Sequence, residues 1–168
     1  RKGGLRVDPE HEVEPGDFAR TLRKVRVPLS AEDARQGVEA EILWAGPIPE
    51  SRFRIESIPF YVYGISYHDV VSAVEVDGLL RFRSVVSRGG HSTYRILLKD
   101  PQGYQSEDFV LAWKPLEVVG CRHEAAKQRW GAIDVPSATD GFTVYHLLEA
   151  SADRGIWTFE EAHCGHVV

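Results

Sequence analysis

Three side chains that could bind an anion or transfer a proton stand at every second position of one short segment: His91, Thr93 and Arg95. In an extended strand, side chains two positions apart leave the same face, so the three would point together. A guanidinium can hold a carboxylate or phosphate through two parallel hydrogen bonds, and an imidazole adds a group that titrates near neutrality. The spacing therefore predicts an anion-binding face; the alternative is the polar outer face of an ordinary half-buried strand.

Three tyrosines, Tyr61, Tyr63 and Tyr67, follow Pro59 within a few residues of one another. Tyrosine has an apolar ring with one polar tip, which is the combination that ligand pockets use. We interpret them as the aromatic wall of a pocket, with plain core packing as the alternative.

The neighbours His68 and Asp69 suggest a catalytic pair. Adjacent residues of an extended chain point to opposite faces, however, so we expect Asp69 to cap a turn instead. If the protein is an enzyme, His91 would be the general base and Arg95 would stabilise an oxyanion, while Asp69 or Glu107 would orient the imidazole.

A third set of residues has the ligand chemistry of zinc: Cys121, His123, His163, Cys164 and His166. The topology predicted below places the two halves of this set on opposite edges of a sheet, about 14 Å apart. Zinc bonds of about 2.0–2.3 Å cannot span that distance, so the set is a weak candidate for metal binding.

The composition disfavours nucleic-acid-binding, membrane-spanning and secreted proteins. The net charge of −5 disfavours a nucleic-acid partner, which needs clustered Lys and Arg. No apolar run approaches the ~20 residues that span a bilayer, and the first residues lack the apolar core of a secretory signal. With only two cysteines the chain suits a reducing cytoplasm. The GxGxxG, GxxxxGK[ST], GxSxG and HExxH motifs do not occur in it, and we expect no cofactor.

The N-terminal half reads as short strands after a mobile arm at 1–20. Alternating apolar residues predict strands over 21–29, 38–48, 51–60, 61–66, 69–76 and 79–87. Asp77-Gly78 is a strong signal for a two-residue hairpin, and Arg88-Gly89-Gly90 predicts a second one. Consecutive short strands without a long helix should curl into a small β-barrel or roll over 21–92.

From residue 91 the predicted order is βαββαβ. Helical periodicity predicts helices over 106–120, with Ser106 as N-cap, and over 137–155, with an apolar face shared by Phe142, Tyr145, Leu148 and Ala152. Strands are predicted over 121–126, 129–136 and 156–164. This is the order of a ferredoxin-like sandwich over 91–168, and strand 91–98 would be shared with the barrel. The fold class is therefore α+β.

Several short motifs resemble the bacterial family known as domain of unknown function 4265 (DUF4265), over about residues 22–162. They are Trp44, Ile58-Pro59-Phe60, Gly64, Asp69-Val70-Val71, Gly90-His91-x-Thr93-x-Arg95, and the later "LEVVGC", "GAIDVP" and "LLEASADRGIWTFEEA". Ser57, His68 and one of Gly89 and Gly90 depart from that family's pattern. The resemblance implies this organisation and a site near 90–95, but no reaction.

Three functions fit these observations. The first is a binding module with a cleft between its halves for a small anionic ligand or a peptide. The second is a small cofactor-free hydrolase, lyase or tailoring enzyme, which requires His91 and a carboxylate to converge in one cleft. The third is an immunity or assembly partner that acts through a flat protein surface.

Overall fold

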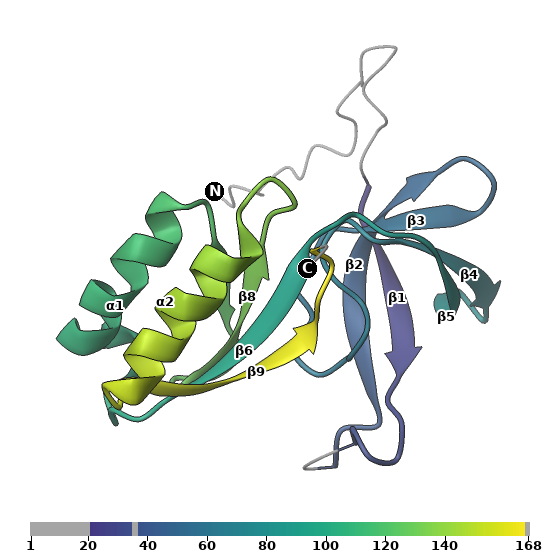
Figure 1. Cartoon of the computed structure of the whole chain (residues 1–168). Helices are drawn as coiled ribbons and strands as arrows, with labels where there is room; N and C mark the ends of the chain where they lie inside the picture. Colours follow the sequence, from purple (N-terminus) through teal and green to yellow (C-terminus); the bar gives the residue numbers. More distant parts are fainter. Residues whose placement is uncertain (1–20, 35–36, 167–168) are drawn as a thin grey trace, which may run out of the picture.

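Two β-sheets and two α-helices form the part of the protein that the structure describes, so the α+β class is confirmed (Figure 1). The computed structural model describes residues 21–34 and 37–166, and the predicted arm at 1–20 lies outside them. In this part of the chain no helix has the length and apolar character needed to cross a membrane.

The first sheet closes into a ring of five strands. They are β1 (Arg23–Pro28), β2 (Ala40–Ile48), β3 (Arg52–Ile55), β4 (Val70–Val76) and β5 (Leu79–Ser87). Each strand pairs antiparallel with the next, and β1 pairs in parallel with β5, which closes the ring. Inward-facing side chains such as Val25, Leu43 and Ile55 fill its core. The predicted hairpin at Asp77-Gly78 is confirmed, since both residues adopt the positive φ that such turns require.

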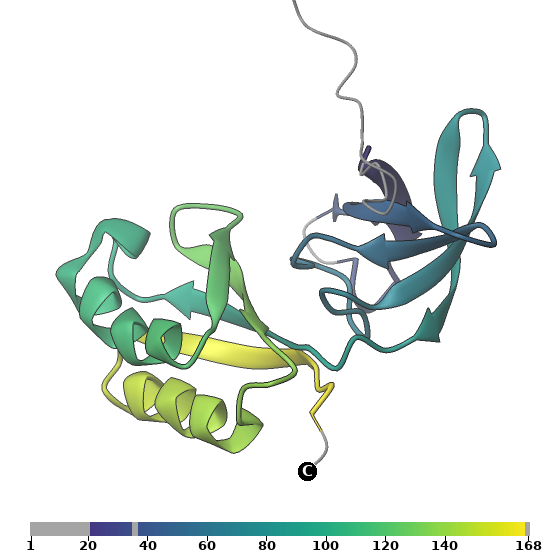
Figure 2. The same cartoon turned by 90° about the horizontal axis from the view of Figure 1, so that it is seen from above.

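The second sheet has the strand order β7-β8-β6-β9 and is antiparallel throughout. Its strands are β6 (Ser92–Leu98), β7 (Arg122–Ala125), β8 (Trp130–Val135) and β9 (Trp157–His163). A short 3-10 helix, η2 (Gly103–Gln105), precedes α1 (Glu107–Val118), and α2 (Gly141–Asp153) follows β8. The two helices cover one face of this sheet (Figure 2), and Ile96, Leu116 and Leu148 are among the core residues between the two layers.

Side-chain caps start both helices. Ser106 Oγ accepts the Phe109 amide of α1 at 3.1 Å, as predicted, and Asp140 accepts the Thr143 amide of α2 at 3.0 Å. Pro115 lies inside α1 without dividing it.

The predicted apolar face of α2 is only partly buried. Leu148 is buried, but Phe142 and Tyr145 are 57% and 41% exposed, because Val144, Leu148 and Ser151 form the stripe that faces the sheet. Phe142 and Tyr145 instead line a cavity described below.

Two further predictions about the chain path are wrong. Residues 61–66 form no strand, because most of their paired amides and carbonyls bond to side chains and only the Gly64 amide bonds to the backbone of a strand, at Ala162 of β9. The Arg88–Gly90 segment is no hairpin, since β5 belongs to the ring and β6 pairs only within the second sheet. Strand 91–98 is therefore not shared, and the connection between β3 and β4, residues 56–69, links the two sheets. We call it the bridging loop.

Candidate functional site

Side chains along β6 point alternately to the two faces of the second sheet, and this alternation places each candidate residue on one face. Tyr94, Ile96 and Leu98 enter the core beneath the helices. Thr93 and Arg95 leave the opposite face and contact the bridging loop. His91, just before the strand, extends the same row, so the predicted common orientation of these three side chains is observed.

The bridging loop is attached to the second sheet at three places. Ser66 Oγ lies 2.7 Å from Thr93 Oγ1, and the Gly64 amide donates to the Ala162 carbonyl of β9 at 3.1 Å. Arg95 donates from Nη2 to the Val62 carbonyl. The polar row on β6 is thus mainly a contact surface between the two sheets.

A buried carboxylate shapes the bridging loop from the other side. Glu41 of β2 accepts three consecutive backbone amides, from Phe60 at 2.7 Å, Tyr61 at 2.9 Å and Val62 at 2.8 Å. These amides have no strand partner, so an anionic acceptor satisfies a turn that would otherwise bury unpaired donors. The position of the aromatic residues in this loop follows from Glu41.

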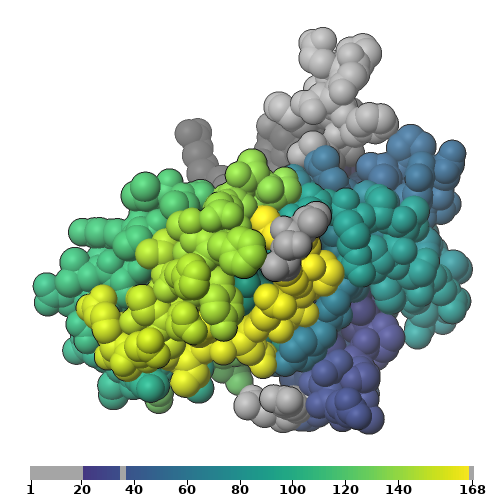
Figure 3. All heavy atoms as spheres, in the orientation of Figure 1, coloured from purple at the N-terminus to yellow at the C-terminus, as the bar shows by residue number. Residues whose placement is uncertain are grey.

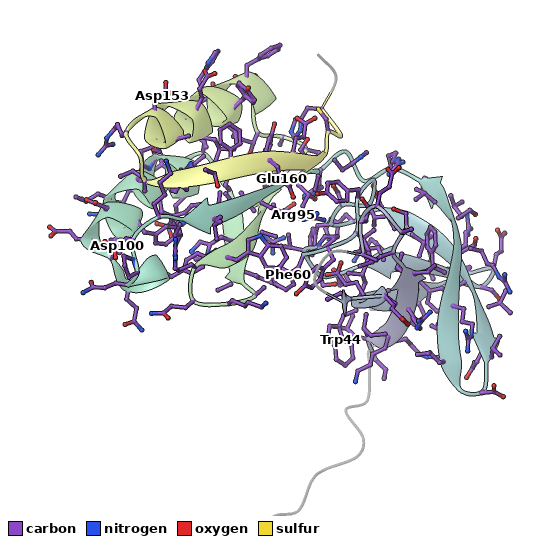
Figure 4. All side chains as sticks on the ribbon, turned by 90° about the horizontal axis from the view of Figure 1, so that it is seen from below. Trp44, Phe60, Arg95, Asp100, Asp153 and Glu160 are labelled. Atoms are coloured by element: carbon purple, nitrogen blue, oxygen red, sulfur yellow. The ribbon has the colours of Figure 1, made fainter. Side chains whose placement is uncertain are left out.

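A cleft of about 350 Å³ opens where the bridging loop meets the second sheet. Its aromatic wall consists of Phe60, Tyr61, Tyr63 and Trp130, and its cations are Arg95, Lys127 and Arg129. Figure 4 shows Phe60, Arg95 and Glu160 between the two sheets, away from Asp100 and Asp153. The Tyr61 and Trp130 rings pack with centroids 4.9 Å apart, which joins the loop to β8 across the cleft.

Arg95 is the central cation of this cleft. Its side chain is only 3% exposed, and its guanidinium carbon lies 4.3 Å from the centroid of the Tyr63 ring. Glu160 of β9 is the nearest carboxylate, with its Oε1 3.6 Å from Nη1 and 2.8 Å from the Tyr63 hydroxyl that donates to it. Arg95 Nε is buried and has no hydrogen-bond partner within 21–34 and 37–166.

The other two cations of the cleft differ in their protein contacts. Arg129 donates from Nε to the Leu98 carbonyl at 2.7 Å, whereas Lys127 has no ion pair among the described residues. The lining carboxylates are Asp33 and Glu160, so three cations face two anions in the cleft.

The three tyrosines predicted to form one pocket wall lie in two different parts of the structure. Tyr61 and Tyr63 line the cleft, but Tyr67 does not. The Tyr67 ring stacks on His68 at 4.0 Å, the Arg122 guanidinium lies 4.3 Å from its centroid, and its hydroxyl donates to Glu56 at 3.2 Å.

His91 belongs to this second group of residues. Its Nδ1 lies 2.7 Å from Oδ1 of Asp134, a fully buried carboxylate of β8, and Arg122 Nη2 donates to the other oxygen at 2.8 Å. His68 packs edge-on against His91 at 5.1 Å. Burial lowers the pKa of His68, which the Glu56 carboxylate only partly offsets, so this imidazole is neutral at pH 7.

The predicted orienting carboxylates are wrong. Asp69 accepts the Gly89 amide at 2.9 Å, the Ser66 amide at 3.0 Å and Arg88 Nη1 at 2.9 Å, so it holds the sheet-to-sheet connection. Glu107 lies in the first turn of α1, on the helical side of the sheet. Asp134 occupies the position beside His91 instead.

His91 and Arg95 do not serve one reacting atom. Four residues of extended chain separate them by about 13 Å, whereas a general base must lie within about 3 Å of the proton it takes. The pairing of His91 as base with Arg95 as oxyanion stabiliser therefore stays a prediction, and it requires a substrate long enough to reach both side chains.

The zinc candidates lie on the two edge strands, β7 and β9, or just beyond them. Cys121 is buried, and this burial raises the pKa of its thiol to about 12. The His123 ring stacks on Tyr104 at 5.3 Å. His166 bonds to Ser92 and Pro136, while Cys164 is exposed. No group of three or more metal-binding side chains occurs among the described residues.

Sequence reasoning missed Glu41, Lys127, Trp130 and Asp134. One signal was present for Asp134, because Ala132 and Asp134 alternate with Ile133 and Val135 in a central strand. A charged side chain on a buried strand needs a partner, which predicts an ion-pair network there. No comparable local signal marks the other three.

The comparisons with known proteins agree with this architecture and add no activity. The model of the family described as "Domain of unknown function (DUF4265)" matches residues 41–159. A solved structure, described as a novel crystal structure of a hypothetical protein from Neisseria gonorrhoeae, superposes with a TM-score of 0.70. It is 19% identical and covers 88% of this chain and 97% of its own. No curated protein matches. The match over 41–159 confirms the resemblance, and the chain belongs to the DUF4265 family.

Proposed function

We propose that the protein is a binding module whose cleft takes a small organic anion with an aromatic or apolar body. The observation that carries the proposal is Arg95, which is buried, lines the cleft and has a guanidinium nitrogen without a hydrogen-bond partner among the described residues. An incoming carboxylate or phosphate would pair with this guanidinium, for which Glu160 is the nearest carboxylate, 3.6 Å from Nη1.

The surroundings of Arg95 favour the same ligand class. Lys127 adds a cation at the cleft, and Tyr61 and Trp130 offer ring surface for an apolar body. A cavity of 350 Å³ falls in the range of small-molecule sites. A peptide would bind here through a terminal carboxylate rather than along its length.

We also propose that the binding module consists of two structural units. The ring over 21–92 would act as a small barrel, and the sheet with its two helices over 91–168 as a ferredoxin-like sandwich. The strand order β7-β8-β6-β9 and the helices on one face support this division.

An enzyme is the second candidate, favoured by the contact of 2.7 Å between His91 and buried Asp134. A carboxylate that fixes an imidazole in this way is the usual support of a general base. The binding function is better supported, because the cleft contains neither residue.

The test is a thermal-shift and calorimetric screen with benzoate, inorganic phosphate and AMP, paired with the neutral compounds benzamide and adenosine. We expect an anion to raise the unfolding temperature and to bind at least about tenfold more tightly than its neutral counterpart. Equal binding of both members of each pair, or no shift with any anion, would overturn the proposal.

Variants locate the site. Arg95→Gln is expected to weaken anion binding about tenfold or more. The exposed Lys127→Gln should weaken it about threefold without loss of stability. Lys114→Gln, on the exposed side of α1, is the charge-matched control and should change nothing.

A further inference from the structure

A second cavity lies on the other face of the second sheet. It has a volume of about 640 Å³ and opens between the N-terminal half of α2, strands β6 and β9, and the residues that follow β9. Figure 3 shows α2 and β9 side by side on one face of the molecule. We call this cavity the helix-side pocket.

Aromatic rings form much of its wall. Phe142 and Tyr145 project from α2 and remain 57% and 41% exposed, while Tyr94 of β6 is buried at the base. The Tyr145 ring packs edge-on against Phe159 with centroids 5.7 Å apart, which fixes its orientation. Large rings held open to a cavity offer faces that a ligand can cover.

The charged groups of the pocket are all acidic. Asp140 and Glu161 line it, and none of its lining residues is Lys or Arg. Glu161 Oε2 accepts the Tyr94 hydroxyl at 3.0 Å, which places this carboxylate beside an aromatic ring. The Asp140 carboxylate accepts the Thr143 amide and hydroxyl, so it also counters the partial positive charge at the N-terminus of α2.

His166 also lines the pocket, and both nitrogens of its ring have hydrogen-bond partners. Its Nε2 lies 3.0 Å from the Pro136 carbonyl, which accepts its hydrogen bond. Its Nδ1 lies 2.6 Å from Ser92 Oγ, which also accepts the Gly165 amide at 2.9 Å. These contacts hold the residues after β9 in place at the wall of the pocket.

We propose that the helix-side pocket binds an organic monocation of the alkylammonium class. Aromatic faces attract such ions through the ring quadrupole, and the Glu161 carboxylate supplies the opposite charge. This inference does not rest on the anion cleft, which lies on the opposite face of β6.

The experiment titrates the full chain with choline and, separately, with 3,3-dimethyl-1-butanol, in which carbon replaces the charged nitrogen. Amide chemical shifts follow the binding. We expect saturable shifts in residues of α2 and β9 with choline, and affinity for the neutral analogue lower by about three- to thirtyfold. Equal affinity for the two compounds, absence of choline binding, or shifts confined to the cleft would overturn the proposal.

Variants test the two features of the pocket that would bind the cation: the Glu161 carboxylate and the aromatic ring of Phe142. Glu161→Gln and Phe142→Ala should each weaken choline binding several-fold. Glu149→Gln removes an exposed carboxylate of α2 that does not line the pocket, so this variant should bind choline as the wild type does. Phe142 is exposed, and an unchanged unfolding temperature in its variant separates lost binding from lost fold. Wild-type affinity in Glu161→Gln and Phe142→Ala would refute the assignment.

Discussion

The cleft and the helix-side pocket are built from consecutive residues of one strand but have opposite charge. Arg95 enters the cleft beside Lys127 and Arg129, while its neighbour Tyr94 enters the pocket beside Glu161. Because side chains of a strand alternate between faces, a single strand in the middle of a sheet can serve two sites. The chemistry of each site is then decided by what packs on that face: the bridging loop on one, the helix α2 on the other.

The two sites also differ in how they are held. The cleft depends on contacts between the bridging loop and the second sheet, such as those of Thr93 and Arg95. Buried carboxylates hold the groups on either side of this joint: Glu41 holds the bridging loop, and Asp134 holds His91 and Arg122. The helix-side pocket depends on packing within the second sheet and its helices. Changes to the joint between the sheets should therefore affect anion binding in the cleft and leave choline binding in the pocket nearly unchanged.

The largest effect is expected for Asp134→Ala. The substitution leaves His91 Nδ1 buried without its acceptor and releases Arg122 from β8. Removing one member of a buried charged network costs about 3 kcal/mol or more in the free energy of unfolding. Urea unfolding measures this cost, and Asp153→Ala at the exposed end of α2 is the control. A variant as stable as the wild type would show that Asp134 does not support the joint.

Glu41→Gln should be the next most damaging change. An amide presents one acceptor and two donors to three backbone amides that now bond to a carboxylate. We expect a loss of about 2 kcal/mol in stability and faster hydrogen exchange at residues 60–62. Glu39→Gln, which removes an exposed carboxylate close by, should do neither. Unchanged exchange at 60–62 would contradict the role given to Glu41.

Gly89→Ala tests the connection between the sheets. A β-carbon at this position would lie 2.6 Å from the backbone carbonyl of His68, which cannot move as a side-chain end could. We expect a loss of about 1–2 kcal/mol. Gly46→Ala in β2 is the matched control, since its nearest contact is 3.7 Å away. Equal stabilities of the two variants would mean that the connection can shift without cost.

The smallest effect is expected far from the cleft, at His123 of β7. Burial among Tyr104, Phe109 and Trp113 lowers the pKa of His123, and its Nδ1 has no partner in the described structure. His123→Phe retains the ring packing and removes an unsatisfied nitrogen, so we expect a gain of up to about 1 kcal/mol at pH 7.

The same residue gives a pH dependence of known sign. The pKa of His123 is lower in the folded state than the value of about 6.5 in the unfolded chain. Below about pH 6.5 the unfolded chain therefore binds a proton at this residue more readily than the folded protein does. This difference destabilises the folded state as pH falls through the folded pKa, so the wild type loses stability from pH 7 towards pH 5. His68 and His163, whose pKa values burial also lowers, add to the loss. The His123→Phe variant should show a smaller loss between these pH values, and an equal loss would assign the effect to the other histidines.

Local patterns predicted the parts of this fold that depend on nearby residues. The common face of His91, Thr93 and Arg95, the Asp77-Gly78 turn and the Ser106 cap each follow from spacings of a few residues. These features need no knowledge of what packs against them.

The parts that were mispredicted depend on distant partners. Residues 61–66 carry the alternation of a strand, but a carboxylate 20 residues earlier takes the Tyr61 amide. Asp134 stands 43 residues from His91, and only the register of β6 with β8 brings Thr93 opposite Asp134. The path of residues 61–66 and the partner of His91 therefore depended on residues far away in the sequence, which no local pattern reveals.

Within residues 21–34 and 37–166, the strands of the ring all precede those of the second sheet, and the change from one to the other at Arg88–His91 has a consequence for synthesis on the ribosome. All five strands of the ring precede that crossing, so they can pair while the rest of the chain is still being made. Strand β6 is different, because its partners β8 and β9 are made later. The Glu41 contacts can thus preorganise the bridging loop early, and Arg95 docks onto a partner that is already folded.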